Sequence, residues 1–286
     1  MKTKQILLPT DFSPNARKAI DYAIYLFENV ECKFHILNSY QVSASGLENT
    51  RSRARGTRLF RAIKEEAERN IKRLVNELET KNKNSLHTFE GHSIADSLVN
   101  AVAWTIKNNN IEFVFMGTKG SSAVKEVFMG SSTIQILKHI DYCPIVAVPS
   151  DYSYDLPDKI VFATNFEHVY SKAELVPLIE LAKLWNSKID IVHVEKGEEL
   201  NDNQKAAKSL LAKRLHKLSQ SFIEVDGHSK ISEAIMSYTE SNKEIGMIVM
   251  INYWHSFFEK LTKENVIKRV VFYTEVPFLI LPLIDS

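Results

Sequence analysis

The chain has 286 residues, of which 44% are hydrophobic and 25% are charged, with 9 glycines and 8 prolines. This composition excludes a disordered, collagen-like or low-complexity protein, and the length suits two domains of ordinary size. The net charge of +1 excludes a globally basic protein, so we expect no nucleic-acid partner. The charge is unevenly distributed: residues 1–150 carry a net charge of +5, and residues 151–286 carry a net charge of −4. This asymmetry is typical of solvated surfaces; the alternative is that the positive half holds an anionic ligand.

Two features bear on the cellular compartment. The first apolar run, Ile6–Pro9, is short, and no run of about 18 apolar residues follows, so we expect neither a signal peptide nor a membrane partner. Cys32 and Cys143 are too few for a disulfide framework and lack C-x-x-C spacing. We therefore expect a cytoplasmic protein.

The first half of the chain alternates short apolar strands with helices. The strand Ile6–Pro9 is followed by Ser13-Pro14, an N-cap and a first-turn proline that predict a helix. Further strands are expected over residues 34–37, 86–89, 112–116 and 145–148, and helices over 58–79, from the N-cap Ser93 to 106, and over 131–140. This alternation predicts a parallel sheet covered on both faces, with ligands bound beyond the carboxyl ends of its strands.

Four segments of the first half recur in the same order in the second half. The matched pairs are Ile6–Phe12 with Ile160–Phe166, Lys33–Leu37 with Lys188–Val192, Glu90–Ser93 with Asp226–Ser229, and Cys143–Pro149 with Val276–Pro282. The shared order predicts a tandem duplication. We place the two domains at residues 1–150 and 159–286, joined by a linker at 151–158.

The most informative segment of the first copy is rich in glycine. Nine residues separate Met116-Gly117-Thr118-Lys119-Gly120 from Gly130-Ser131-Ser132. Glycines let backbone N–H groups approach a phosphate, and a helix that starts with serines offers further donors and a favourable dipole. The pattern predicts a phosphate site; the alternative is a loop that only turns the chain.

The spacing G-x2-G-x9-G-[ST], together with Pro9-Thr10-Asp11-Phe12, resembles the ATP-binding type of the universal stress protein family. The resemblance covers nearly all of residues 1–150, and residues 159–286 resemble a second, degenerate copy. It implies an α/β fold of two tandem domains, each an open five-stranded parallel sheet sandwiched by helices, of the adenine nucleotide alpha hydrolase-like type.

The resemblance also implies a ligand, ATP with or without Mg²⁺, and a role for each matching residue. Asp11, beside Pro9 and Thr10, would contact the adenine side of the nucleotide, and Ser39 would offer backbone groups to adenine. Met116 and Gly117 would approach the ribose, and the phosphates would be surrounded by Gly120, Gly130, Ser131 and Ser132.

The second copy departs from this pattern. No glycine follows Gly246, and aligning Pro277 with Pro144 puts Lys263, Glu264 and Asn265 opposite Gly130, Ser131 and Ser132. A carboxylate there would repel phosphate. Asn165 also replaces Asp11. We expect one competent site, with Tyr253, Trp254, Phe257 and Phe258 filling the second; the alternative is that the second copy binds the same ligand through other residues.

Other candidate motifs are weaker. Five arginines, Arg51, Arg53, Arg55, Arg58 and Arg61, suggest a solvated loop or, as the alternative, a partner-binding arm. The nine histidines show no familiar ligand spacing, so we expect no structural metal. Neither the P-loop nor the Rossmann dinucleotide motif occurs.

Three classes of function remain open: an ATP-binding stress-response or signalling protein, a slow ATPase, and a ligand-free interaction module. Asp11 is the only acid in the matched motif, and the resemblance puts it at the base end of the nucleotide. The sequence therefore favours a binding protein without catalytic residues and leaves weak hydrolysis open. Members of the family that this chain resembles commonly pair through their last strands, so the resemblance implies an intramolecular pseudo-dimer through strands 145–148 and 278–281, both apolar enough to be buried. A homodimer of whole chains is left open.

Overall fold

The computed structural model describes residues 2–41, 58–118, 131–153, 155–195, 197, 199–227, 230–252 and 265–284. The chain divides into two compact units, unit 1 (Met1–Met116) and unit 2 (Gly117–Ser286). Within the described ranges, no helix is long and apolar enough to cross a membrane.

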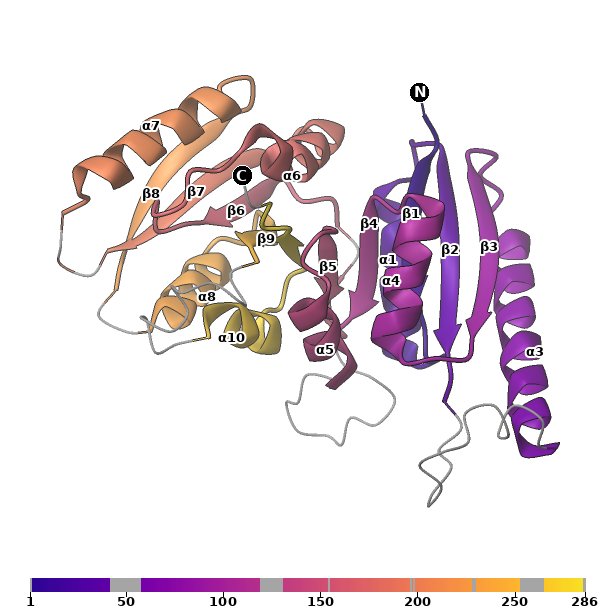
Figure 1. The fold of residues 1–286 in the computed structure, drawn as a ribbon. Helices are drawn as coiled ribbons and strands as arrows, with labels where there is room; N and C mark the ends of the chain where they lie inside the picture. Colours follow the sequence, from indigo (N-terminus) through magenta and orange to yellow (C-terminus); the bar gives the residue numbers. More distant parts are fainter. Residues whose placement is uncertain are drawn as a thin grey trace, which may run out of the picture. The chain divides into compact units, whose positions relative to one another are not determined.

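Unit 1 is an open parallel sheet with helices on both faces (Figure 1). Its strands lie in the order β3-β2-β1-β4. In chain order its elements are β1 (Lys4–Pro9), α1 (Pro14–Leu26), β2 (Cys32–Ser39), α3 (Arg58–Lys81), β3 (His87–Ile94), α4 (Leu98–Asn109) and β4 (Phe113–Gly117). The predicted alternation of strands and helices is confirmed.

The topology of unit 1 fixes which helix covers which face. The connections from β1 to β2 and from β2 to β3 run in one direction across the sheet, and the connection to β4 runs back. Since such crossovers are right-handed, α1 and α3 share one face and α4 covers the other, in front of the strands in Figure 1. A Cβ built on Gly91 of β3 would meet Ile71 of α3, which identifies the α3 face.

One helix start differs from its prediction. Ser93 lies inside β3, where it pairs with Asn38 of β2, and the N-cap of α4 is Ser97, whose hydroxyl accepts a hydrogen bond from the Asn100 N–H. The ladder with β2 therefore continues past the expected helix start. Ser13 does cap α1 as predicted, and Pro14 is the first residue of that helix.

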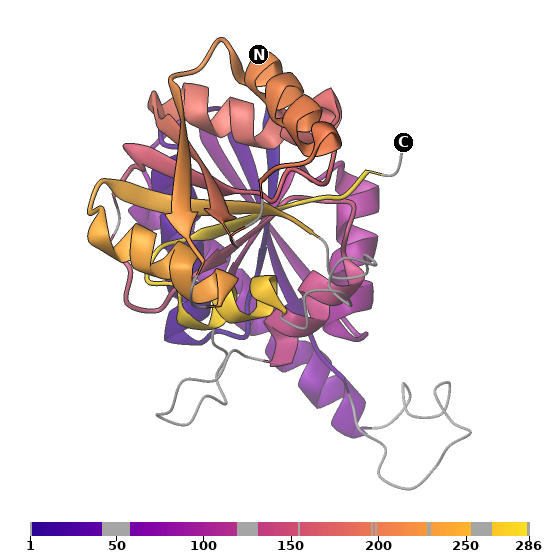
Figure 2. The same cartoon turned by 90° about the vertical axis from the view of Figure 1, so that its left-hand side faces the viewer.

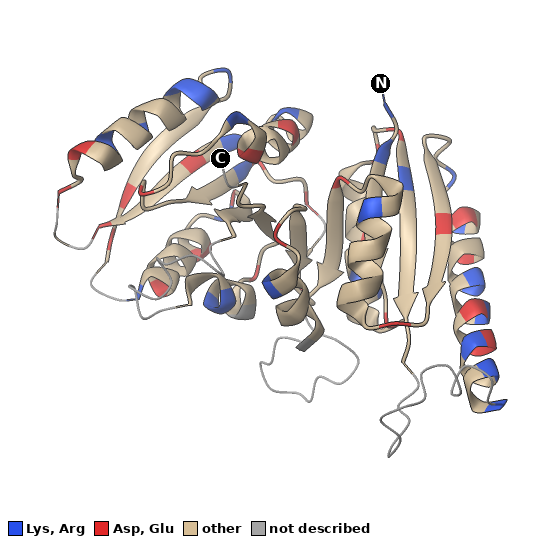
Figure 3. Ribbon diagram, viewed as in Figure 1, with Lys and Arg blue, Asp and Glu red and all other residues tan. Residues whose placement is uncertain are grey.

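The predicted arginine cluster is only partly described. Arg58 and Arg61 lie in the first turn of α3, both exposed, and Arg51, Arg53 and Arg55 lie outside the described residues. The outer surface of α3 carries charges of both signs (Figure 3). Ion pairs four residues apart, such as Lys81 with Glu77, neutralise part of this surface.

Unit 2 has the strand order β5-β10-β9-β6-β7-β8. Its elements are α5 (Ser131–His139), β5 (Ile145–Val148), β6 (Lys159–Ala163), α6 (Lys172–Trp185), β7 (Lys188–Glu195), α7 (Asp202–Leu215), β8 (Gln220–Asp226), α8 (Ile231–Ser241), β9 (Ile245–Ile251), α10 (Val266–Tyr273) and β10 (Phe278–Leu281). Helices α6 and α7 lie on one side of the strands β6 to β10, and α8 and α10 on the other (Figures 1 and 2).

The last strands of the two sequence copies pair with each other. β10 is antiparallel to β5, with Leu279 opposite Val146, whereas β10 and β9 are parallel. The predicted pairing of strands 145–148 and 278–281 is thus confirmed. It also explains why the division into compact units falls at residue 116 rather than at 150, because β5 packs with the second copy. The proposed sequence domains, 1–150, 151–158 and 159–286, remain a prediction about the duplication.

Candidate nucleotide site

The carboxyl end of β1 forms a tight polar turn. The Thr10 hydroxyl accepts the Phe12 N–H at 2.9 Å, and Asp11 Oδ1 accepts the Ser13 N–H at 3.0 Å. Phe12 has a φ of 62°, in the left-handed region. The turn holds the Asp11 carboxylate at the surface directly beyond the buried residues Pro9 and Thr10.

A residue that the sequence analysis missed ties this turn to β2. Asn38, at 9% exposure, donates from Nδ2 to the Thr10 carbonyl at 2.8 Å, and the Thr10 N–H donates to the Leu37 carbonyl at 2.7 Å. Ser39 is the last residue of β2 and pairs with Ile94. An amide side chain at the end of a strand of buried residues is the signal that could have identified Asn38.

Within unit 1, the predicted base-side residues lie at the same edge of the sheet. Met116 is two residues beyond Val114, which pairs with Leu7, and Pro9 is two residues beyond Leu7 on the parallel strand. The structure thus brings together Pro9, Thr10, Asp11, Ser39 and Met116 at the carboxyl ends of β1, β2 and β4. An exposed carboxylate at this edge fits hydrogen-bond donors of an adenosine group.

The predicted phosphate-side residues belong to unit 2 or lie outside the described residues. Gly120 and Gly130 lie outside them, Ser131 is the first residue of α5, and Ser132 is exposed in its first turn. Thr133, which the sequence analysis did not single out, donates from its hydroxyl to the Gly117 carbonyl at 2.9 Å. This bond holds the first turn of α5 to Gly117, the first residue of unit 2.

The second copy repeats the β1 turn in detail at the end of β6. The Thr164 hydroxyl accepts the Phe166 N–H at 3.0 Å, and Asn165 Oδ1 accepts the Glu167 N–H at 3.2 Å. Phe166 has a φ of 59°. His193 takes the place of Asn38, with its Nδ1 3.1 Å from the Thr164 carbonyl. The duplication therefore extends to individual hydrogen bonds.

The two copies differ in what covers this turn. Phe166 is 1% exposed, packed against Phe222 and beneath the Lys208 ammonium, whereas Phe12 is 38% exposed. Gln204, in the first turn of α7, donates from Nε2 to the Asn165 carbonyl at 2.9 Å. The end of β6 is therefore closed by residues of its own copy.

The second copy also uses its helix start differently. Asn265 is the N-cap of α10, and its side chain accepts the Lys268 N–H at 2.8 Å, so this oxygen is engaged within the helix. Lys263, Glu264 and the aromatic residues Tyr253, Trp254, Phe257 and Phe258 lie outside the described residues.

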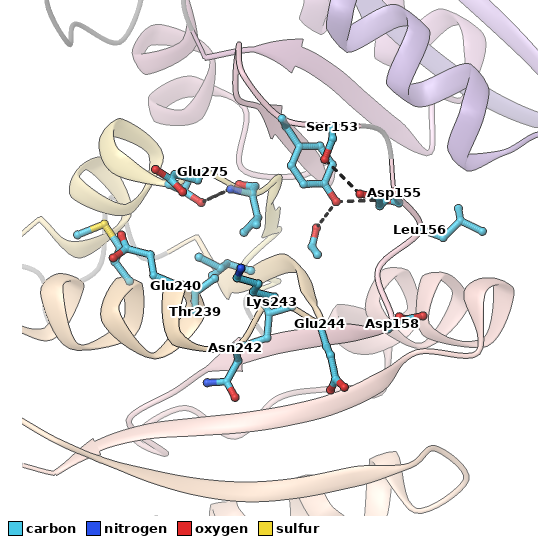
Figure 4. A pocket seen from close by; sticks show the side chains of 17 residues that line it. Ser153, Asp155, Leu156, Asp158, Thr239, Glu240, Asn242, Lys243, Glu244 and Glu275 are labelled. Atoms are coloured by element: carbon cyan, nitrogen blue, oxygen red, sulfur yellow. Dashed lines mark hydrogen bonds between the residues drawn. The ribbon is translucent and has the colours of Figure 1, made fainter.

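A cavity of about 500 Å³ lies at the opposite edge of the unit 2 sheet (Figure 4). It is lined by residues that precede strands, including Asp158 before β6 and Glu244 before β9, and by Glu240 and Lys243. The Tyr152 hydroxyl, from the predicted linker, donates to the Asp155 and Gly246 carbonyls at 3.2 and 3.3 Å. Ligands of open parallel sheets bind at carboxyl ends, so this cavity is not the predicted nucleotide site.

Thiol chemistry has no support at the first cysteine. Cys32 is buried at the start of β2, and burial raises the pKa of its thiol to about 12. The nucleophilic form is the thiolate, which this pKa disfavours at neutral pH.

The fold and the turns define a class: an α/β protein with one mixed, mostly parallel sheet formed by two similar halves, and with polar turns where nucleotide-binding folds place their ligands. The family model of the universal stress proteins matches residues 2–149, more than half of the chain. The chain therefore belongs to the universal stress protein family.

Solved structures agree with this fold along the whole chain. A universal stress protein from Archaeoglobus fulgidus DSM 4304 is 17% identical, with a TM-score of 0.65, and the match covers 96% of this chain and 95% of that one. A functionally unknown protein from Pseudomonas aeruginosa PAO1 is 11% identical, with a TM-score of 0.60, and the match covers 98% and 92%. At these identities the likeness concerns the fold. A search of curated proteins finds no significant match.

Proposed function

We propose that this protein is an ATP-binding stress-response or signalling protein with one nucleotide site, formed by the first copy. The observation that carries the proposal is the contrast between two otherwise equal turns. The turn at Asp11 and Phe12 is exposed, and the turn at Asn165 and Phe166 is closed by Gln204. Only the first copy also has the Gly117, Gly120 and Gly130 spacing that suits a phosphate.

In this proposal the residues divide the nucleotide between them. Asp11 accepts hydrogen bonds from the adenosine group, beside Pro9, Thr10, Ser39 and Met116. Gly117 approaches the ribose with Met116. Gly120 and Gly130 and the helix start at Ser131 and Ser132 offer N–H and hydroxyl donors to the phosphates. Donors of this kind bind ground-state phosphate and the transition state about equally, so they favour retention of ATP over turnover. The second copy serves as the pseudo-dimer partner of the first. The compartment proposed for the protein is the reducing cytoplasm, where Cys32 and Cys143 remain free thiols.

The test is calorimetric titration of the full chain with ATP. We expect one ATP per chain, no binding after Gly130→Val, and a loss of about 10-fold or more after Asp11→Asn, because a hydrogen bond to a charged group is lost. Asn165 forms the same turn with an amide, so Asp11→Asn removes the charge and keeps the turn. The matched control is Asn165→Asp, which should leave the affinity unchanged.

Three results would overturn the assignment: no binding by the full chain, two ATP per chain, or normal binding by Gly130→Val. Single-turnover release of phosphate from bound ATP separates binding from catalysis. A rate near about 10 per second, lost in Lys119→Ala or Lys125→Ala, would identify an ATPase instead.

A further inference from the structure

A cluster of two imidazoles and a carboxylate lies on the α4 face of unit 1. His35 is in β2, and Glu90 and His92 are in β3; His35 pairs with Glu90, and Leu37 pairs with His92. Since Gly91 faces α3, its neighbours Glu90 and His92 face the other way. His35 is 1% exposed, and the other two side chains are half-buried.

The candidate ligand atoms of this cluster converge. His35 Nδ1 is 2.9 Å from His92 Nε2 and 4.0 Å from Glu90 Oε2, and His92 Nε2 is 3.9 Å from Glu90 Oε1. The edge of a tetrahedron around Zn²⁺ is roughly 3.3 Å, from bond lengths of about 2.0–2.1 Å. The separation of the two imidazole nitrogens is within about 0.4 Å of this edge. The two distances to Glu90 are to different oxygens, Oε2 for His35 and Oε1 for His92, and one ligand atom from each of the three residues lies within 4.8 Å of the other two.

Hydrogen bonds outside the cluster orient the lone pair of His35. Gln5 donates from its Nε2 to the Thr3 carbonyl at 3.1 Å, so its Oε1 is the atom that faces His35 Nε2 at 2.9 Å. The proton of His35 is consequently on Nε2, so Nδ1 accepts a hydrogen bond from the His92 Nε2–H at 2.9 Å. Binding of a cation would move the His92 proton to its Nδ1, and both facing nitrogens would then offer lone pairs. Histidine ligands of metals commonly donate their other N–H to such a second-shell oxygen.

Glu90 has a second-shell partner as well. Its Oε2 lies 2.5 Å from the ammonium of Lys33, a side chain that is 38% exposed. A carboxylate has two oxygens, so Lys33 can keep Oε2 while Oε1 binds a cation. This hydrogen bond fixes the carboxylate in place.

The second copy has no such cluster at the matching position. Asp190 replaces His35, and its carboxylate accepts the Tyr238 hydroxyl of α8 at 2.9 Å. The residues that pair beside Asp190 and Val192 are Ser221 and Ile223, which are not metal ligands of this kind. Among the residues that the structure describes, the convergent donors thus occur in the first copy and not at the matching strands of the second.

We propose that His35, Glu90 and His92 form a Zn²⁺ site, with water as the fourth ligand. Two imidazole nitrogens and one carboxylate oxygen are an established zinc donor set. The ion would join β2 to β3, the edge strand of unit 1, through side chains. This inference goes beyond the proposed function and does not depend on ATP binding.

The test uses the full chain, stripped of metal with a chelator and titrated with Zn²⁺ alone, without nucleotide. We expect one Zn²⁺ per chain, a visible absorption spectrum of tetrahedral Co²⁺ on cobalt substitution, and a rise in melting temperature with Zn²⁺. Glu90→Gln and His92→Gln should each abolish the Co²⁺ spectrum. Gln5→Met, which keeps all three ligands, should weaken Zn²⁺ binding by about 10-fold.

The control is His139→Gln, which removes an exposed histidine and should leave Zn²⁺ binding unchanged. Because Glu90 is half-exposed and Gln has the same shape, Glu90→Gln tests the site in a chain whose folding circular dichroism can verify. No saturable binding by the full chain, an octahedral Co²⁺ spectrum, or equal binding by folded Glu90→Gln would overturn the proposal.

Discussion

Replacing Glu174 by Gln should destabilise the protein strongly, although the two side chains have the same shape. Glu174 is 0% exposed at the start of α6. Its Oε2 accepts the Ser171 N–H at 2.6 Å, its Oε1 accepts the Ile284 N–H at 3.0 Å, and His168 Nε2 lies 3.0 and 3.1 Å from the two oxygens. One carboxylate thus serves a helix cap, a histidine and the C-terminal segment.

The magnitude follows from these contacts. A glutamine offers one acceptor oxygen, so one of the two buried N–H groups would face an NH₂ group. A hydrogen bond to a charged group contributes about 1.5–3 kcal/mol, and the remaining bonds would weaken because the charge is lost. We expect the free energy of unfolding to fall by about 3 kcal/mol. Denaturant unfolding at pH 7 measures this loss, with the exposed Glu180→Gln in the same helix as control, expected within about 0.5 kcal/mol of the wild type.

The effect of Glu174 should depend on pH in a defined direction. Burial alone would raise the pKa of this carboxyl, but the Ser171 N–H, His168 and the Ile284 N–H outweigh burial and lower the pKa below its usual value. A lowered pKa in the folded state stabilises the protein above the unfolded-state pKa of about 4.3. This stabilisation is lost as the pH falls through the folded-state pKa. The difference in the free energy of unfolding between the wild type and Glu174→Gln should therefore become smaller below about pH 4. Two results would refute the reasoning. One is a difference in the free energy of unfolding that stays constant from pH 5 to pH 3. The other is a loss of that free energy at pH 7 equal to the loss caused by Glu180→Gln.

Two further substitutions test the architecture of unit 1. Asn38→Ala removes the 2.8 Å hydrogen bond to the Thr10 carbonyl. Denaturant unfolding should therefore show a loss of about 1–3 kcal/mol in the free energy of unfolding, and titration should show a weaker affinity for ATP. An unchanged free energy of unfolding would contradict the role given to Asn38. Gly91→Ala places a Cβ against Ile71 Cγ2, closer than real side chains approach, and should cost about 1–3 kcal/mol. Combining Gly91→Ala with Ile71→Ala should cost less than the sum of the single changes, and strict additivity in this cycle would argue against the clash.

The fold was predictable because its signals are local. Apolar runs such as Ile145–Val148 define buried strands, and the capping residue Ser13 with Pro14 defines the start of α1. The pairing of β5 with β10 was predicted from the family resemblance, and the apolar character of both strands agreed with it. The start of α4 was misplaced because Ser93 also precedes acceptable helix residues, and only the ladder with β2 shows that the strand continues through it.

The candidate site was predictable only in part, because several of its determinants are contacts between distant segments. The exposed Asp11 turn follows from a short motif. The closure of the equivalent turn by Gln204 depends on how α7 packs, and no spacing in the sequence encodes that. In the same way, His35 and His92 are 57 residues apart and meet only through the register of β2 and β3. A search for ligand spacing along one segment therefore misses them.

The pairing of β5 with β10 has a consequence for how the duplicated chain can be divided. A fragment ending at residue 150 would leave the four residues of β5, all buried in the intact chain, without β10 beside them. An apolar strand edge of this kind recruits other chains. In a dimer of separate chains the partner is lost on dilution, whereas a covalently attached partner is present at a fixed ratio at every concentration. The second copy can therefore lose a ligand site of its own and still be required, as the permanent cover for the last strand of the first.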